Sequence, residues 1–323
     1  MSGSTLFSIG EALIDMIPSR VGCSFDEVSS FSPRTGGAPA NVCAAFARLG
    51  GKSAFLSQLG DDPFGHKIAR ELEACGIDLS HLAFTDKANT ALAFVSLEED
   101  GSRTFSFYRK PSADLLYSPE QIDPAWFADA FALHYCSVSL VDSPMSYAHL
   151  AAIAAAREAG AIVSFDPNLR EPLWPSLDAA AEQMLWGLKN ADVVKISGEE
   201  AEFLFGCGCE KSAELILNDC GAKLVMITLG SEGCFIKNRA AQCRVPAARV
   251  KAADTTGAGD IFGGSAAYCL LSSGKAPEDL NEEELNAMGR FACAAAGLSV
   301  QRPGGISSVP GKEEILALLA AGD

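Results

Sequence analysis

Residues 254–260, with the sequence Asp-Thr-Thr-Gly-Ala-Gly-Asp, join a glycine-rich loop to a carboxylate, and a small and apolar run follows over residues 261–271. This run predicts a helix, so the backbone N–H groups of Gly257, Ala258 and Gly259 would lie at a helix N-terminus that favours an anion. Asp260 would repel a phosphate that was the only ligand. It fits a reaction in which it takes the proton of a hydroxyl group while the N–H groups hold the phosphoryl group being transferred. The loop therefore predicts a kinase that acts on an alcohol; the simpler alternative is a helix start with an aspartate near its cap.

Two groups of residues near the start of the chain have the types that bind a polyhydroxylated ligand. Residues 36–41 read Gly-Gly-Ala-Pro-Ala-Asn, which predicts a tight entry into a helix where the backbone can approach a ligand. Asn41 can both donate and accept hydrogen bonds and so suits sugar hydroxyls. Asp15 follows the first predicted strand, and ligands of open parallel sheets bind beyond the carboxyl ends of the strands. A capped helix start and a surface aspartate are the simpler alternatives.

Two further loops follow predicted strands. Residues 166–170 read Asp-Pro-Asn-Leu-Arg, where Arg170 could neutralise phosphate or reach a sugar, or the loop could serve only as a cap. Residues 228–233 read Thr-Leu-Gly-Ser-Glu-Gly and could wrap nucleotide phosphates, although glycine-rich turns after strands are common. The P-loop pattern is absent, and no Gly-x-Gly-x-x-Gly follows the first strand, so a P-loop enzyme is excluded and a dinucleotide fold is unsupported.

Composition narrows the class of protein. The 323 residues could form two average domains or one large α/β domain with a small appendage, and the 48% hydrophobic content allows a substantial core. The formal net charge of −16 argues against nucleic acid or anionic membranes as partners. We find no apolar run of transmembrane length and no secretory signal pattern. Eleven scattered cysteines without a Cys-x-x-Cys favour core packing in a reducing cytoplasm over a disulfide framework or metal cluster. The four histidines show no metal-ligand spacing and are interpreted as structural or surface groups.

Short apolar strands alternate with helical segments along most of the chain. Strands are expected at Thr5–Ile9 and at residues 131–138, 161–166, 192–196 and 223–228. Helices are expected at residues 40–49, 64–75, 145–159, 177–188, 259–271 and 283–299. Strands separated by helices of this length imply an α/β fold with a doubly wound, parallel sheet.

One region departs from this alternation. Residues 91–97 and 104–109 are rich in β-forming residues and flank an Asp-Gly at residues 100–101, which marks a hairpin. Residues 13–17 and 27–31 are also strand-like. Four such strands would form a small separate sheet, which is either a lid over a cleft or an ordinary β excursion.

The chain resembles the ribokinase-like, or PfkB, family of carbohydrate kinases in both of that family's signatures. The N-terminal signature matches residues 36–41 with Gly50 and Gly60 downstream, and the C-terminal signature matches residues 254–260. The resemblance covers nearly the whole chain. Within the family the chain most resembles the fructokinases, on residues 10–15, 105–114 and 166–175. The Arg-x-Pro-Ser-Ala-Asp piece that begins at Arg109 discriminates best, because 2-keto-3-deoxygluconate kinases tend to carry a different sequence after this lid arginine.

The resemblance implies one ribokinase-like kinase domain over residues 1–323, with a central mostly parallel sheet flanked by helices. It also implies a small β-sheet lid at about residues 12–34 and 90–111, which in this family often mediates a homodimer. The implied reaction transfers the γ-phosphoryl group of ATP to the C6 hydroxyl of D-fructose, with Mg²⁺ and, as in many members, K⁺. Asp260 is the implied catalytic base, and Gly257, Ala258 and Gly259 are the implied anion hole.

The resemblance also assigns the remaining positions to three ligands. The implied sugar contacts are Asp15, Gly36, Gly37, Asn41, Phe107, Arg109, Asn168, Arg170 and Asp260. The implied nucleotide contacts are Lys195, Glu200, Thr228, Gly230, Gly233, Gly257 and Gly259. The implied monovalent-cation positions, several of them through backbone carbonyls, are Asp254, Thr256, Ser299, Arg302, Gly304 and Ser308.

The chain departs from the family pattern at one motif, and three other functions remain as alternatives. The family's Asn-x-x-Glu motif appears as Ser-Gly-Glu-Glu at residues 197–200, which keeps Glu200 and changes only the role of Ser197. A 2-keto-3-deoxygluconate kinase would need a cationic pocket, which Arg109 and Arg170 could supply. A ribose or nucleoside kinase is less favoured by the fructokinase-like stretches. A non-catalytic sensor on a kinase fold is disfavoured because the chain keeps Asp260, Gly259 and Glu200, whereas a sensor need not keep the base.

Overall fold

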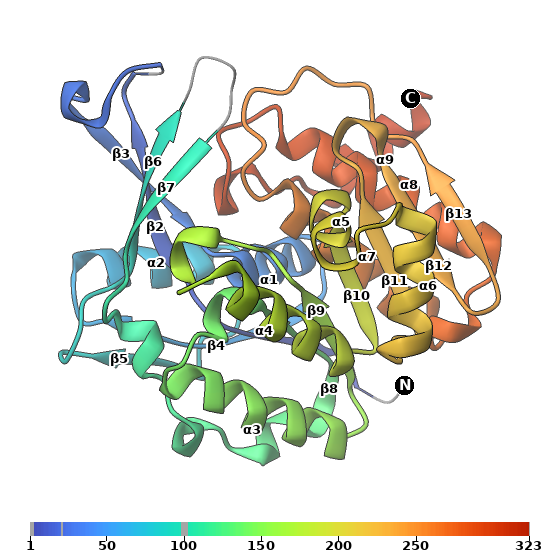
Figure 1. Ribbon diagram of the computed structural model, residues 1–323, viewed down its shortest axis with the longest axis horizontal. Coiled ribbons are helices and arrows are strands. Elements are labelled where there is room, and N and C mark those ends of the chain that lie inside the picture. The colour runs from blue at the N-terminus through green and yellow to red at the C-terminus, as the bar shows by residue number, and fades with distance from the viewer. Residues whose placement is uncertain (1–2, 21, 98–102, 323) are drawn as a thin grey trace.

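The computed structural model describes residues 3–20, 22–97 and 103–322. The alternation of strands and helices builds a nine-stranded sheet covered by helices on both faces, and a separate four-stranded sheet lies at one end of it (Figure 1). The mixed α/β fold with a large, mostly parallel sheet and a small second sheet confirms the predicted fold class.

The large sheet sets the position of the candidate site. Its strands lie in the order β13 (Gln242–Val245), β12 (Cys234–Asn238), β11 (Leu224–Thr228), β10 (Val193–Ser197), β9 (Ile162–Asp166), β8 (Ala130–Cys136), β1 (Thr5–Ile9), β4 (Lys52–Gly60) and β5 (Leu82–Thr85). The pairs from β11 to β5 are parallel, whereas β12 and β13 are antiparallel additions at one edge. From β1 the chain proceeds to β4 and β5 at one edge, whereas from β8 it proceeds through β9, β10 and β11 toward the other edge. The carboxyl ends of β1 and β8 therefore flank a topological switch point, which is where open α/β sheets bind ligands.

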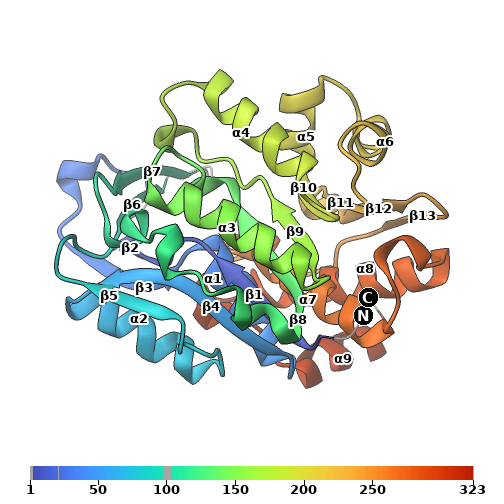
Figure 2. The same cartoon turned by 90° about the horizontal axis from the view of Figure 1, so that it is seen from below.

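Helices cover the two faces of this sheet (Figure 2). One face carries α3 (Pro144–Glu158), α4 (Leu177–Lys189), α5 (Gly198–Phe205) and α6 (Cys209–Asp219). The other carries α1 (Ala38–Arg48), α2 (Pro63–Ala74), α7 (Ala258–Ser273), α8 (Glu282–Ser299) and α9 (Lys312–Ala320). Within the described residues no helix is long and apolar enough to cross a membrane.

Helices α1 and α7 pack closely because α7 presents a glycine to the backbone of α1. A Cβ added at Gly264 would lie 2.5 Å from the carbonyl oxygen of Val42 and 2.7 Å from Cβ of Ala45. A Cβ at the neighbouring Gly263 would find its nearest contact at 4.0 Å. The close approach matters for the site, because α1 and α7 each carry one of its polar side chains.

We expect Gly264→Ala to destabilise the fold and Gly263→Ala to leave it unchanged or slightly more stable. The alanine at 264 forces the two helices apart, and overpacking of this kind costs about 1–3 kcal/mol. The alanine at 263 has space and gains up to about 1 kcal/mol of helix propensity. Urea unfolding of the two variants tests this, and equal midpoints would contradict the packing argument.

The small sheet has the order β3 (Phe31–Gly36), β2 (Leu13–Pro18), β6 (Leu92–Leu97) and β7 (Arg103–Tyr108). The strand expected at residues 27–31 was wrong: residues 25–27 form a 3₁₀ turn and the strand begins at Phe31. The reason is local, since Ser24 and Glu27 form a capping box that starts a helical turn. The Asp-Gly turn expected at residues 100–101 lies outside the described residues.

Sequence reasoning also missed β4, the longest strand. Eight of its nine residues are buried, but Ser53, Ser57 and Gln58 interrupt the apolar pattern. The structure satisfies these polar side chains internally: Ser57 Oγ donates to the carbonyl of Gly10 at 2.6 Å, and Gln58 Nε2 donates to that of Ala113 at 2.9 Å. Because these buried polar side chains are satisfied by distant parts of the chain, the strand does not need a regular hydrophobic pattern, and none is visible in its sequence.

Candidate active site

The loop that ends in Asp260 enters α7 without any side-chain cap. Gly257 is the N-cap residue and adopts a left-handed conformation with φ 78°, which glycine tolerates without strain. The first turn of this 16-residue helix therefore presents backbone N–H groups that no capping side chain occupies. Such groups, at the positive end of a helix dipole, form an anion site.

Asp260 lies in the first turn of α7 and is 8% exposed. Its Oδ2 accepts a hydrogen bond from Nδ2 of Asn41 on α1 at 2.8 Å. Burial, and then repulsion from Asp166, raise the pKa of Asp260 to about 7, although the Asn41 hydrogen bond and the nearby Lys195 and Arg170 act in the opposite direction. A carboxylate with a pKa near neutrality is suited to proton transfer.

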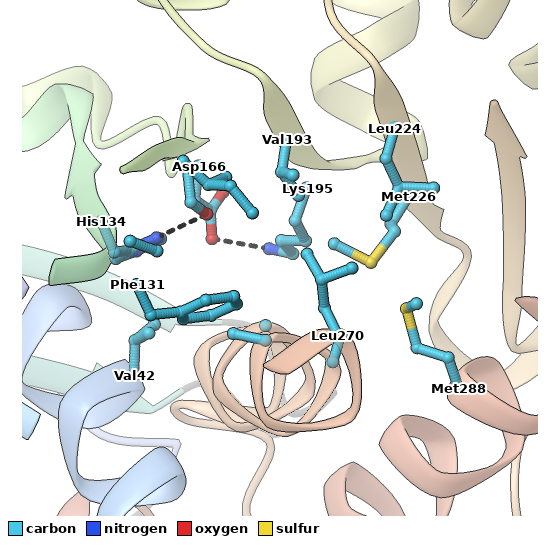
Figure 3. Close-up of a pocket in the computed structure, with 16 residues that line it drawn as sticks. Val42, Phe131, His134, Asp166, Val193, Lys195, Leu224, Met226, Leu270 and Met288 are labelled. Atoms are coloured by element: carbon cyan, nitrogen blue, oxygen red, sulfur yellow. Dashed lines mark hydrogen bonds and ion pairs between the residues drawn. The ribbon is translucent and has the colours of Figure 1, made fainter. Parts of the chain in front are cut away.

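Lys195 brings a positive charge to the same loop. It lies on β10, and its Nζ is 2.9 Å from Oδ2 of Asp166 at the end of β9 (Figure 3). A Cβ added at Gly259 would lie 2.7 Å from this Nζ, so the ammonium group lies against the loop in the space beside this glycine. Burial alone would lower the pKa of Lys195, but the carboxylates of Asp166, Glu200 and Asp260 together raise it. The side chain is therefore a charged ammonium at the helix N-terminus.

Apolar side chains enclose this ion pair on its inner side. A cavity of about 20 Å³ lies beneath it, and Figure 3 shows Phe131, Leu270 and Met226 around the opening. His134 lines the same cavity, and its Nδ1 is 3.1 Å from Oγ of Ser164. Burial lowers the pKa of His134 to about 3, so the imidazole is neutral. The charges of Lys195 and Asp166 therefore act through a medium of low polarity, where they interact more strongly than in water.

A cleft of about 970 Å³ opens over the carboxyl ends of β9, β10 and β11. Lys195, Glu200, Thr228 and Gly230 line it, together with the loop residues Thr255, Thr256, Gly257, Gly259 and Asp260. Gly233, expected at the nucleotide, is not among its lining residues; a Cβ there would lie 2.0 Å from the carbonyl oxygen of Val245. Glu200 accepts hydrogen bonds from the backbone N–H of Leu169 at 2.7 Å and of Ser197 at 2.9 Å. Its carboxylate thus ties two strand ends together at the cleft wall.

A second pocket of about 60 Å³ adjoins this cleft under the small sheet. The expected sugar contacts that line it are Asp15, Gly37, Asn41, Phe107, Asn168, Arg170 and Asp260. Asn41 Oδ1 is buried and has no hydrogen-bond partner within the described part of the chain, so it is available to a ligand donor. Asp260, Gly257, Thr256, Asn168 and Arg170 line both pockets. The carboxylate of Asp260 therefore lies where the two spaces meet.

Two expected sugar contacts have other positions. Gly36 does not line the pocket, and its Cα lies so close to Asp15 that an added Cβ would be 2.2 Å from the carboxylate. The guanidinium of Arg109 is buried in an ion pair with Asp114, outside the pocket lining. Glycine at 36 thus makes room for Asp15.

Glu11 and Phe105 are among the lining residues that were not expected. Glu11 lines the floor, and Phe105 covers the pocket from β7 beside Phe107, with ring centroids 5.8 Å apart. The guanidinium of Arg170 lies 5.7 Å from the centroid of Phe105. The two-residue period of a strand already placed Phe105 on the same face as Phe107 and could have revealed it. Glu11 carried no such signal.

The residues assigned to a monovalent cation connect the anion loop to the segment after α8. Asp254 accepts hydrogen bonds from the backbone N–H of Thr256 and of Gly304, each at 2.8 Å. A Cβ added at Gly304 would lie 2.8 Å from the carbonyl oxygen of Thr256. Ser299 and Ser308 are buried, whereas the side chain of Arg302 forms a surface ion pair with Glu314. Among the described residues no cluster of three or more His, Cys, Asp or Glu could hold a metal ion.

Comparisons with known proteins agree on one family. Residues 4–312 match the family described as pfkB family carbohydrate kinase. The chain is 42% identical over 322 residues to Fructokinase-2 of Solanum lycopersicum, covering 99% of this chain and 98% of that protein.

Solved structures give the same result. A fructokinase from Xylella fastidiosa with bound ATP superposes with a TM-score of 0.90 at 36% identity, covering 98% of both chains. A double mutant of a fructokinase from Vibrio cholerae O395, solved with fructose, ADP and potassium ion, superposes with a TM-score of 0.88 at 34% identity, covering 98% of this chain and 99% of that one.

Proposed function

The chain belongs to the pfkB family of carbohydrate kinases, and we propose that it transfers the γ-phosphoryl group of ATP to the C6 hydroxyl of D-fructose, giving fructose 6-phosphate and ADP. The observation that carries this proposal is the position of Asp260 between a large cleft and a small polar pocket, next to an open helix N-terminus. The likeness to fructokinases over nearly the whole chain supports the choice of sugar.

Asp260 acts as the base in this proposal. An alcohol has a pKa far above that of any carboxylate, so Asp260 orients the C6 hydroxyl and takes its proton late, as the bond to phosphorus forms. Asn41 holds the carboxylate in place through its 2.8 Å hydrogen bond. Gly257, Ala258 and Gly259 hold the transferring phosphoryl group with their N–H groups, and Lys195 adds a positive charge beside Gly259.

The remaining lining residues divide between the two substrates. Asp15, Gly37, Asn41, Asn168 and Arg170 bind the hydroxyl groups of the sugar, while Phe107 covers it from the small sheet. Glu200, Thr228 and Gly230 border the nucleotide, and Gly233 shapes the turn after β11. Residues 12–34 and 90–111 form the lid, whose role is to exclude water that would otherwise accept the phosphoryl group.

Two cations fit the residues present. Mg²⁺ is bound largely through phosphates and water, so it needs few protein ligands, and Glu200 in the cleft wall is the side chain placed to reach its shell. When bound it would neutralise charge on the phosphates. K⁺ fits the loop of Asp254 and Thr256, where Gly304 lies close to the Thr256 carbonyl and donates to Asp254. Ser299, Arg302 and Ser308 are the further positions that the family resemblance assigns to this cation. K⁺ when bound would supply positive charge behind the anion loop.

Charge in the small pocket supports a neutral sugar over an acid one. The rival 2-keto-3-deoxygluconate kinase needs a cationic pocket, and Arg109 is already paired with Asp114. Arg170 is then the cationic side chain in a lining that also holds the carboxylates of Glu11, Asp15 and Asp260. A lining with three acidic groups and one basic group disfavours a substrate carboxylate.

The direct test is ADP release from Mg-ATP by the purified protein, with fructose and 2-keto-3-deoxygluconate offered at equal concentration. We expect a clear preference for fructose. A preference for the acid sugar would reassign the substrate while leaving Asp260 in its role. Sugar binding without any ADP release would favour a sensor instead of a kinase.

The pH profile provides a second test. The carboxylate form of Asp260 is the active base, and burial raises its pKa to about 7. The kcat/KM for fructose should therefore fall tenfold per pH unit on the acid side of about pH 7 and level off above it. A profile that is flat down to pH 5 would contradict the proposed base.

The small sheet also supports a homodimer through the lid. Its outer strands β3 and β7 leave edges that another copy could pair. Phe25, Phe31, Phe94 and Tyr108 form a cluster of contacting rings on this sheet, and Tyr108 is 62% exposed. Sedimentation velocity at micromolar concentration would distinguish a dimer from a monomer.

All eleven cysteines are free, which supports a cytoplasmic location.

A further inference from the structure

Arg109 follows β7 at the edge of the sugar pocket, yet its guanidinium points into the protein. The side chains of Arg109 and of Asp114, which lies in the 3₁₀ turn Ala113–Leu116, are each 1% exposed. Nε of Arg109 donates to Oδ2 of Asp114 at 2.9 Å, and Nη2 bonds the same oxygen. Ser112 Oγ donates to the other carboxylate oxygen. Asp114 is therefore fully engaged in holding the arginine.

The guanidinium lies directly behind the pocket wall. Its Nη1 donates to the carbonyl of Val138 at 2.9 Å, and its Nη2 donates to Oγ of Ser139 at 2.9 Å. Ser139 Oγ in turn donates to Oε2 of Glu11 at 2.7 Å. Val138 and Glu11 line the sugar pocket, whereas Arg109 and Asp114 do not. One layer of atoms thus separates the Arg109 charge from the sugar.

We propose that Asp114 is a specificity-determining residue that acts through Arg109: by pairing with the guanidinium behind the wall, it removes a positive charge from the sugar pocket and so excludes sugars that carry a carboxylate. Asp114 touches no substrate in this proposal and is a positioning residue. The inference rests on the proposed function, because it explains why the same pocket accepts a neutral ketose.

The balance of charge gives the physical reason. The pocket lining holds three carboxyl groups, on Glu11, Asp15 and Asp260, against Arg170. If Asp114 were neutral, the charge of Arg109 would be shared with Glu11 and would extend to the pocket through a medium of low polarity. An acid sugar would then gain an attractive partner, while a neutral sugar would gain little. The pairing of Arg109 with Asp114 therefore acts mainly by weakening the binding of the acid sugar, and not by strengthening that of the neutral one.

The test compares the wild type with Asp114→Asn, which keeps the size of the side chain and removes its charge. The dissociation constants of fructose and 2-keto-3-deoxygluconate are measured by calorimetry, and kcat/KM is measured for both. We expect the preference for the acid sugar relative to fructose to rise roughly tenfold, equivalent to about 1.4 kcal/mol. The double variant Arg109→Met/Asp114→Asn is the matched control and should lose this gain, because the released charge is absent.

The outcomes separate this inference from the function on which it rests. If the wild-type enzyme binds fructose and Asp114→Asn leaves the ratio of the two dissociation constants unchanged, only the proposed role of Asp114 is overturned. Wild-type enzyme that prefers the acid sugar would overturn both. Because a buried arginine left unpaired can impair folding, Ser112→Ala offers a milder variant that weakens the hold on Asp114. It should move the ratio in the same direction by a smaller factor, and no movement would count against the proposal.

Discussion

Replacing Asp260 by asparagine should lower kcat for fructose phosphorylation by at least about a hundredfold and leave ATP binding nearly unchanged. General base catalysis contributes about 10²–10⁴-fold, and an amide cannot take the hydroxyl proton. The amide keeps the size of the carboxylate and can still meet Asn41. Steady-state kinetics with fructose and calorimetric titration with ATP measure the two quantities. Near-normal turnover would remove Asp260 from the catalytic role.

Stability should change in the opposite direction, which separates lost chemistry from lost folding. The pKa of Asp260 is raised from its ordinary 3.8 to about 7, so the folded state holds a proton that the unfolded chain releases between these values. The contribution of Asp260 to the free energy of unfolding is therefore complete below about pH 4 and is lost as the pH rises to about 7. At pH 8 the Asp260→Asn protein should melt at a higher temperature than the wild type, while at pH 4 the difference should vanish.

A surface carboxylate provides the matched control. Asp178 lies in the first turn of α4 and is exposed, and α4 covers the opposite face of the sheet from α7. Asp178→Asn makes the same change of charge and should preserve turnover. A similar loss in both variants would point to net charge and not to the position of Asp260.

Replacing Lys195 by methionine should lower kcat/KM for ATP by about a hundredfold or more. The ammonium group stands beside Gly259 at the start of α7, where the proposal places the transferring phosphoryl group. Removing a single preorganised group that stabilises charge in the transition state typically costs 10²–10³-fold. Initial rates over a range of Mg-ATP concentrations measure the effect.

The same substitution leaves Asp166 buried without its partner. Breaking a buried ion pair by removing one member costs about 3–5 kcal/mol, so Lys195→Met should also unfold at lower urea concentration. The double variant Lys195→Met/Asp166→Asn removes both charges and should regain most of that stability. It should not regain turnover, because the positive charge at the loop is still missing. Recovery of turnover in the double variant would show that Lys195 only neutralises Asp166.

Local sequence was sufficient wherever the structure depends on neighbours in the chain. The run of small and apolar residues after Asp260 predicts a helix because no proline interrupts it, and Gly257 is the residue type that a left-handed N-cap favours. The polar residues after β1, β9 and β11 could be assigned to one edge because parallel strands bring their carboxyl ends together. The signatures at both ends of the chain were enough to identify the family.

The chain between these motifs was harder to interpret. Strand β4 was missed because buried polar residues interrupt its apolar pattern, and two of them, Ser57 and Gln58, donate to the carbonyls of Gly10 and Ala113, which are far away in the sequence. The strand expected at residues 27–31 was misplaced because alternation alone did not reveal the capping turn at Ser24. In both cases a hydrogen bond outweighed the hydrophobic pattern.

Sequence alone therefore determined the family and the fold class and predicted the loop that carries the proposed base, because each depends on residue types at short spacing. Tertiary structure decided which side chains meet. Asn41 reaches Asp260 across 219 positions, and Lys195 fills the space that Gly259 leaves. Arg109, which the family resemblance implied as a sugar contact, is held by Asp114 and by the carbonyl of Val138. The direction of a long charged side chain depends on partners that folding brings together, and so only the packed chain reveals it.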